Sequence, residues 1–425
     1  MYLLKYVLKR IALMLLTMFI ITTMCFVFVK LLPNMPVEQF GKDMQFILKR
    51  REMLGYDRPI MEQYVYYIFG RTGYTYDKLD ANGNKVQDKD NNGNLLWQMY
   101  EVTDEHGNPV YVTDANGNYL DRDGNITYNK DYFVVKTDYV LDENGEKIPV
   151  WATETVYDIS KVPEGMSYTK KAYGGIIRGY FGVSEVVYLG RDVWDVFAEK
   201  IPFTVSLNLY SILISIPLGL ALGIFAALKK NKWQDHVIST GVMIFVSVPS
   251  FIYAFLVQYL LYFVLGWTAP VSNPAYGAWS WTFFVSIIPA ILSMCFGTIA
   301  GFARYTRAEL TEVLTSEFML LARTKGLTRG QATVRHALRN AMVPIFPMIL
   351  GEFIAIMSGS LIIEQMFSIP GVGQLYVQSI QAKPTPDYNF FMLLTMFYTF
   401  IGLTAGIIID ISYGIIDPRI RMGAR

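Results

Sequence analysis

The feature that most constrains this chain is a set of six apolar stretches, each long enough to cross a lipid bilayer as a helix. A spanning helix needs about 20 predominantly apolar residues. The stretches occupy residues 11–32, 205–228, 237–265, 281–302, 345–367 and 390–415. Backbone polar groups find no water in hydrocarbon, so such stretches are helical. The sequence predicts an all-α polytopic membrane protein with six transmembrane helices.

Composition agrees with this class and excludes several others. The chain is 52% hydrophobic and only 17% charged, whereas soluble domains carry about a quarter charged residues. The formal net charge of +1 gives no basis for a nucleic-acid partner. Both cysteines, Cys25 and Cys295, lie inside apolar runs, so no disulfide framework is expected. The three histidines are scattered along the sequence, and we expect no metal site.

The first apolar run allows two readings, because basic residues precede it as they do in a signal peptide. Its core is longer than a typical signal segment, and no small-residue cleavage site follows it at 32–36. We therefore predict an uncleaved N-terminal anchor helix over 1–32.

Lysine and arginine mark one side of the membrane. Basic residues precede the first run and fill the loops after the second and fourth runs, and they also close the chain. The loop at 266–280 has none, and 368–389 has only Lys383. With six spans, every basic loop lies on one side, which predicts cytoplasmic N- and C-termini. The expected division is an external amphipathic segment 33–70, an extracellular insert 71–175, an external return segment 176–204, a five-helix core 205–415 and a cytoplasmic tail 416–425.

The insert repeats a short Asp-x-x-Gly unit. The units begin at Asp80, Asp90, Asp104, Asp114, Asp121 and Asp142, with short β-rich runs between several of them. Aspartate caps turns and glycine supplies the positive φ that closes a hairpin, so a small β-rich domain is expected. Residues 88–93 also match the first half of a calcium loop, but Met99 stands where the bidentate glutamate is required. We favour hairpin turns.

The basic segment 303–344 is too long for a simple connector. Residues 315–325 and 328–340 both have helical composition and are separated at Gly326. Helical spacing places Phe318, Leu321 and Ala322 on one face of the first helix. This segment fits either a basic amphipathic helix on anionic lipid or a docking element for a cytoplasmic partner.

A set of motifs resembles a known family. Residues 317–327 and 335–344 resemble the coupling loop of ABC importer permeases, in particular the first permease subunit of the oligopeptide/dipeptide (Opp/Dpp) family. Four more stretches agree in order: 54–64, 179–184, 364–373 and 417–421. The resemblance covers about 1–70 and 176–425 and leaves out the insert. One departure is that Leu320, Leu321 and Ala322 stand where the superfamily has Glu-Ala-Ala.

The resemblance implies the fold, the partners and the coupling residues. The fold would be that of a type I ABC importer permease in the bacterial cell membrane. Its partners would be a second homologous permease subunit in a heterodimer, two cytoplasmic ATPase subunits, an extracellular solute-binding lipoprotein, membrane lipid and a peptide substrate. The ATPase-coupling residues would be Glu317, Ala322, Arg323, Lys325 and Gly326. Here Arg323 and Lys325 would pair with acidic groups, and Gly326 would allow a tight bend.

No phosphate-binding loop of the form G-x-x-x-x-G-K-[ST] occurs in the sequence. We therefore expect no catalytic residue and no bound cofactor in this chain, with ATP hydrolysed by the partner subunits.

Polar residues inside the spans are candidates for the passage, because they are costly in a membrane. They are Asn208, Gln258 and Glu352. The alternative role is a hydrogen bond between helices that fixes packing, and Asp410 fits this alternative better.

The expected function is an importer permease that forms half of a peptide passage. A permease for nickel or another small solute stays open. A second alternative is a membrane sensor whose ectodomain signals through its helices, which would need a cytoplasmic output domain. A secondary transporter would typically show paired internal repeats, and we find none in the sequence.

Overall fold

A computed structural model describes residues 2–31, 58–80, 84–89, 95–102, 109–114, 118–120, 126, 134–141, 145–184, 186–383 and 386–416. The chain divides into a helical unit, Met1–Gln39 with Phe181–Arg425, and a second unit, Phe40–Tyr180. The predicted helical membrane fold with a small β-rich insert is confirmed.

The helical unit contains the membrane spans. Within the described residues, five helical segments are long and apolar enough to cross a membrane, or six if one bent pair counts as a single span. The long helices are α1 (Tyr2–Leu31), α4 (Val193–Leu228), α8 (Ile288–Leu314), α11 (Leu338–Ala355) and α14 (Tyr388–Ile416). The shorter helical elements are α7 (Trp281–Ser286), α9 (Glu317–Thr324), α10 (Arg329–Ala332), η5 (Thr333–Ala337), η6 (Ile356–Ser358), α12 (Leu361–Met366) and α13 (Val372–Gln381).

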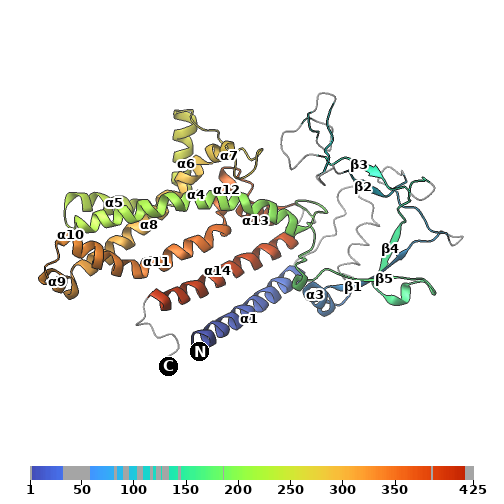
Figure 1. The fold of residues 1–425 in the computed structure, drawn as a ribbon, viewed down its shortest axis with the longest axis horizontal. Coiled ribbons are helices and arrows are strands. Elements are labelled where there is room, and N and C mark those ends of the chain that lie inside the picture. The colour runs from blue at the N-terminus through green and yellow to red at the C-terminus, as the bar shows by residue number, and fades with distance from the viewer. Residues whose placement is uncertain are drawn as a thin grey trace. The chain divides into compact units, whose positions relative to one another are not determined.

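The bent pair is the predicted span 237–265. It consists of α5 (Trp233–Ser247), then α6 (Ser250–Gln258) with η4 (Tyr259–Val264), and the two parts meet at 100°. Pro249 has no N–H to donate, and a residue that precedes proline avoids the helical region. Val248 accordingly has extended angles, φ −85° and ψ 126°. The helix therefore breaks here, and α6 leaves the direction of α5 (Figure 1).

Helices α4 and α8 form the centre of the helical unit, where two glycines of α4 face α8. A Cβ at Gly219 would lie 2.7 Å from Cβ of Phe302, and one at Gly223 would lie 2.6 Å from Cβ of Thr306. Real Cβ atoms do not approach so closely, so glycine is what allows the two backbones to meet. Small residues have this role in membrane helix pairs.

The ends of several helices lie on the same side of the helical unit. Helices α9 and α10, the start of α1 and the end of α14 all lie toward one end of the helical unit (Figure 1). Helix α1 packs on α14, and Arg10 forms an ion pair with Asp410 at 2.8 Å. Asp410 therefore has the packing role that its position in the sequence favoured.

The second unit is built mainly of short antiparallel strands. It begins with α3 (Ile60–Phe69), and β1 (Arg71–Asp77) lies between β4 (Thr153–Val156) and β5 (Thr169–Tyr173). A separate pair consists of β2 (Met99–Glu101) and β3 (Thr137–Tyr139). The 3-10 turns η2 (Ile159–Lys161) and η3 (Ile176–Arg178) complete its described elements.

The Asp-x-x-Gly units are hairpin turns. In five units, an antiparallel bridge joins the residue before the turn to a residue after it. These bridges are Leu79–Lys85, Lys89–Leu95, Thr113–Tyr119, Leu120–Ile126 and Leu141–Lys147. Oδ1 of Asp80 accepts from the backbone N–H of Asn84 at 2.9 Å, and Asp114 accepts from Asn118 at 2.8 Å. Aspartate thus closes its own turn, as expected from the sequence. The unit at 104–107 and most of the turn tips lie outside the described residues.

Candidate functional site

The basic segment 303–344, which we call the coupling segment after the resemblance described above, contains the short helix α9, which is followed by Lys325 and Gly326. The N–H of Gly326 donates to the carbonyl of Arg323 at 3.0 Å, and the N–H of Leu327 donates to the carbonyl of Ala322 at 3.4 Å. Gly326 has φ +89°. This pair of hydrogen bonds with a left-handed glycine is the Schellman ending of a helix. The predicted break at Gly326 is therefore present, and its cause is local.

One face of α9 is buried in the chain's own core. Met319 and Ala322 are 4% and 8% exposed. They pack with residues from the ends of the neighbouring helices: Ala227, Leu310, Ala332, Ala337 and Ala341. We call this set the α9 cluster. Of the three residues for which the sequence predicted a shared face, Ala322 is buried, whereas Phe318 and Leu321 are exposed.

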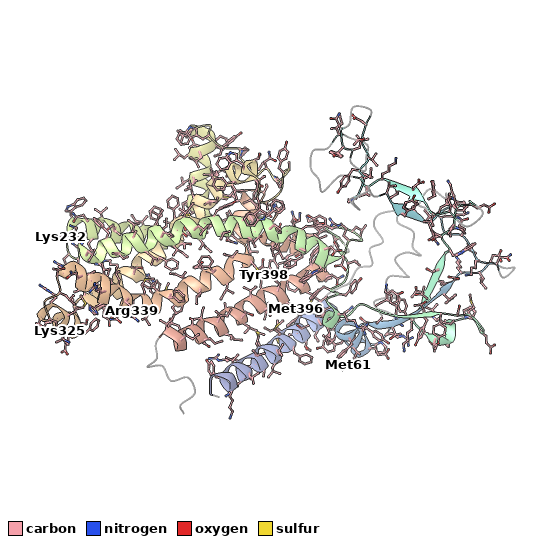
Figure 2. The ribbon with its side chains drawn as sticks, viewed as in Figure 1. Met61, Lys232, Lys325, Arg339, Met396 and Tyr398 are labelled. Atoms are coloured by element: carbon pink, nitrogen blue, oxygen red, sulfur yellow. The ribbon has the colours of Figure 1, made fainter. Side chains whose placement is uncertain are left out.

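The opposite face of α9 is an exposed surface. Phe318, Leu320 and Leu321 are 42%, 64% and 56% exposed, and Arg323 and Lys325 beside them are also exposed. We call these five residues the coupling surface. Lys325 stands at the same end of the helical unit as Lys232 and Arg339 (Figure 2). Glu317 is exposed in the first turn of α9, where a carboxylate is favourable to the helix dipole.

The second predicted helix, 328–340, begins as expected but does not end there. Thr328 and Gln331 form a capping box at its start. The chain then continues through α10, η5 and α11 as one helical stretch into the membrane. The coupling segment is therefore joined to α11 without a flexible connector.

The three polar candidates for the passage have different surroundings. Nδ2 of Asn208 donates to the carbonyl of Ile356 at 2.7 Å, where the helix after α11 breaks. Nε2 of Gln258 donates to the carbonyl of Pro270 at 2.5 Å. Within the described part of the chain, the partly buried Glu352 makes no hydrogen bond or ion pair. These contacts do not bring the three side chains together.

A buried carboxylate that the sequence reasoning had not singled out joins three helices. Glu364, on α12, has no exposed surface. Its Oε1 accepts from Oγ1 of Thr204 on α4 at 3.0 Å, and its Oε2 accepts from the N–H of Gln374 on α13 at 3.0 Å. Oγ1 of Thr204 in turn accepts from the N–H of Val372 at 2.8 Å. We call this set the Glu364 network.

Glycines make room for this carboxylate. A Cβ on Gly371 would overlap Glu364 and Thr204, and one on Gly359 would lie 2.6 Å from Oε1 of Glu364. The signal in the sequence was a glutamate within an apolar run followed by a glycine-rich turn at 370–373. Its partner Thr204 could not have been found, because it lies 160 positions earlier.

Among the residues that the structure describes, no three His, Cys, Asp or Glu side chains come together as a possible metal site.

Comparison with known proteins identifies the family. Residues 219–422 match the model of the binding-protein-dependent transport system inner membrane component. The dipeptide transport system permease protein DppB of Bacillus subtilis is 34% identical over 233 residues, which cover 54% of this chain and 71% of that protein. The oligopeptide transport system permease protein OppB of Haemophilus influenzae is 32% identical over 244 residues, covering 57% and 76%.

Among solved structures, the inward-facing MetNI methionine ABC transporter aligns with a TM-score of 0.41 and 18% identity. The alignment covers 52% of this chain and 97% of that one. From the family model and the similarity to DppB and OppB, the chain belongs to the inner-membrane components of binding-protein-dependent transport systems, and within them to the oligopeptide/dipeptide permease family.

Proposed function

We propose that the chain is the transmembrane permease subunit of an ATP-driven importer and forms half of a passage for dipeptides or oligopeptides. The observation that carries the proposal is the coupling surface, an exposed apolar helix face with basic neighbours in a family of transport permeases. The relatives are named as dipeptide and oligopeptide permeases, which supports a peptide substrate.

The coupling surface has the chemistry of a docking site for an ATPase subunit. Exposed Leu320 and Leu321 match an apolar groove, and Arg323 and Lys325 match acidic groups at its rim. The buried face of α9 rests on the α9 cluster, to which α4 and α8 contribute Ala227 and Leu310. A displacement of α9 by the closing ATPases would therefore reach the spans. Coupling of this kind shifts the equilibrium between inward-open and outward-open states.

We further propose that both termini and the coupling segment are cytoplasmic. The coupling segment, the start of α1 and the end of α14 lie toward one end of the helical unit, and that end carries Lys232, Lys325 and Arg339 (Figures 1 and 2). Positive residues favour the cytoplasmic side. The insert between α1 and α4 would then be extracellular, where it would help to receive the solute-binding lipoprotein.

Among the candidates for the passage, Glu352 is the one we favour for peptide contact. A charged group within a span usually faces a polar pathway or a partner. Asn208 and Gln258 already donate to backbone carbonyls of their own chain. They would shape the passage by holding the helix break and the loop in position. A second permease subunit would supply the other half of the passage.

The test is reconstitution of the whole transporter with Leu320→Asp. A carboxylate on the coupling surface would be desolvated against the ATPase without a partner. We expect loss of ATPase co-purification and of ATP-dependent peptide uptake into proteoliposomes. Thr315→Asp, an exposed position outside the coupling surface, is the matched control and should keep both. Normal docking and uptake with Leu320→Asp would overturn the proposal, and uptake of nickel instead of peptides would overturn the substrate class.

A further inference from the structure

Helix α5 is attached to the helical unit in an unusual way. Asp235 is its single buried residue, with 1% of its surface exposed. Apolar residues of the same helix are exposed, including Val237 at 61% and Met243 at 61%. None of the four apolar clusters formed by the described residues contains an α5 side chain. Apolar packing therefore does not explain how α5 is held at its cytoplasmic end.

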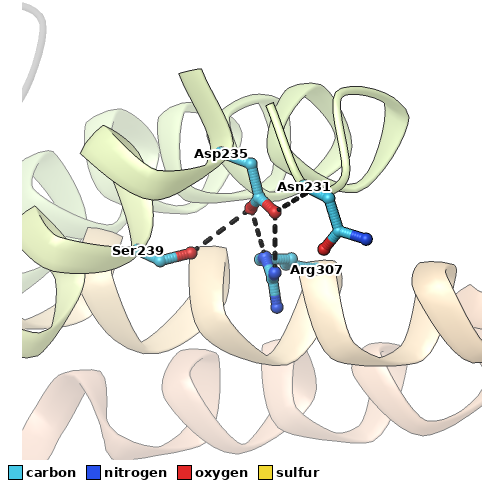
Figure 3. Close-up of polar contacts among 4 residues, drawn as sticks. All are labelled: Asn231, Asp235, Ser239 and Arg307. Carbon is cyan, nitrogen blue, oxygen red and sulfur yellow. Dashed lines mark hydrogen bonds and ion pairs between the residues drawn. The ribbon is translucent and has the colours of Figure 1, made fainter. Parts of the chain in front are cut away.

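The attachment at that end is an ion pair with α8 (Figure 3). Nε of Arg307 donates to Oδ1 of Asp235 at 2.5 Å, and a terminal nitrogen of Arg307 donates to Oδ2 at 2.8 Å. Oδ2 also accepts from the N–H of Asn231 at 3.0 Å, and Oδ1 accepts from Ser239 at 3.3 Å. Two parallel hydrogen bonds fix both distance and orientation, which a single contact does not.

Asn231 prepares the carboxylate for this contact. It has φ +63°, a left-handed conformation that asparagine tolerates better than most residues. This turn between α4 and α5 brings its N–H to Asp235 in the first turn of α5. The carboxylate is thus held by the N–H at its own helix start as well as by Arg307.

The far end of α5 has one aromatic attachment to α8. Phe245 stacks on Phe296 with ring centroids 4.9 Å apart and planes 6° apart. Asp235 and Phe245 are ten positions apart, about 15 Å along a helix. The ion pair and the stacked rings are therefore two separate points that define how α5 lies on α8.

Helix α8 is also the helix that carries the coupling segment. It ends at Leu314, and α9 begins at Glu317. Leu310 of α8 packs in the α9 cluster with Met319 and Ala322 of α9. The end of α8 and α9 thus share one core, and Arg307 stands one turn before Leu310.

We propose that Asp235 and Arg307 are a positioning pair that makes α5 follow α8 when the coupling segment moves. The pair does not touch the coupling surface, so its loss should leave the ATPase docked. It should instead disconnect α5 from the movement, so that ATP hydrolysis continues with less transport. This inference rests on the proposed function for its transport readout.

The experiment compares Arg307→Gln with Arg304→Gln in the reconstituted transporter. Arg304 lies three positions earlier on α8, is exposed, and makes a cation–π contact with the neighbouring Tyr305. Both variants remove one positive charge from the same helix. Two quantities are measured at equal amounts of assembled complex: ATP hydrolysed per peptide imported, and the distance between spin labels at Thr240 on α5 and Ala308 on α8. Cys25 and Cys295 are replaced beforehand.

We expect the number of ATP molecules hydrolysed per peptide imported to rise about fivefold or more in Arg307→Gln. A factor of about five corresponds to the lower end of typical coupling free energies. The spin-label distance should stay constant between nucleotide-free and vanadate-trapped wild type, and change or broaden in Arg307→Gln. Arg304→Gln should match wild type in both. Arg307→Lys keeps the charge without the paired hydrogen bonds and should be intermediate; it replaces Arg307→Gln if that variant does not assemble.

Equal ratios and equal distance distributions in Arg307→Gln and Arg304→Gln would overturn the inference. A wild-type complex that imports no peptide would instead refute the proposed function. In that case the spin-label distances would still decide whether the pair holds α5 to α8.

Discussion

Replacing Glu364 with alanine removes the centre of the Glu364 network. The hydroxyl of Thr204 and the N–H of Gln374 would lose their acceptor in a site that has no exposed surface. Since these donors come from α4 and α13, the change loosens the connection of α12 to both helices. The effect should therefore appear as lower stability of the helical unit.

The magnitude follows from the number of partners. An unsatisfied buried donor costs about 1–3 kcal/mol. Two good hydrogen bonds at 3.0 Å are lost, and the third, from the N–H of Ser360 at 3.3 Å, is long and adds little. The expected loss is thus about 2–6 kcal/mol. At about 2–4 °C per kcal/mol for a domain of 150–250 residues, the melting temperature should fall by about 4–24 °C.

The assay is the melting temperature of the detergent-solubilised chain, read from the monodisperse fraction after heating. Glu312→Ala removes an exposed carboxylate from α8 and is the matched control. The melting temperature of Glu364→Gln should lie between those of Glu364→Ala and Glu312→Ala. The amide oxygen can still accept from Thr204, whereas the amide NH₂ would face the N–H of Gln374 without an acceptor between them. Equal melting temperatures for Glu364→Ala and Glu312→Ala would show that the network does not stabilise the fold.

Three further outcomes are expected. Gly326→Pro should abolish peptide uptake while membrane insertion is retained, because proline cannot adopt φ +89° or donate the N–H that ends α9; unchanged uptake in proteoliposomes would contradict this. A cysteine at Asn273 should react with an impermeant reagent from outside and one at Lys230 should not, and the reverse pattern would invert the proposed orientation. Gly223→Leu should lower the yield of folded chain, since its side chain would meet Thr306 at the crossing of α4 and α8; an unaltered gel-filtration profile would argue against close packing there.

Local patterns predicted the elements that depend on local causes. The helix ending at Gly326 requires a left-handed residue, and the Asp-x-x-Gly turns close through hydrogen bonds four residues apart. Both can be read from short stretches of sequence. The buried face of α9 could not be predicted in this way, because residues 318–322 are all apolar and show no alternation of apolar and polar positions. Only the helices against which α9 packs decide that Met319 and Ala322 are buried while Leu320 is exposed.

The bend between α5 and α6 is an intermediate case. Pro249 was visible inside the predicted span, and proline weakens a helix wherever it stands. However, the prolines of α4 at 202 and 217 lie within one uninterrupted helix. The same residue type therefore bends one span by 100° and leaves another continuous. The surroundings of each proline determine which outcome occurs.

By itself, the sequence determined that this chain enters a membrane and where its apolar segments lie, because transfer from water to lipid depends on each segment's own composition. The tertiary structure alone decided which polar groups meet. Asp235 binds Arg307 across 72 positions and Glu364 binds Thr204 across 160. A buried charged group needs partners at hydrogen-bond distance, and those partners are brought there by the packing of helices that are far apart in the chain.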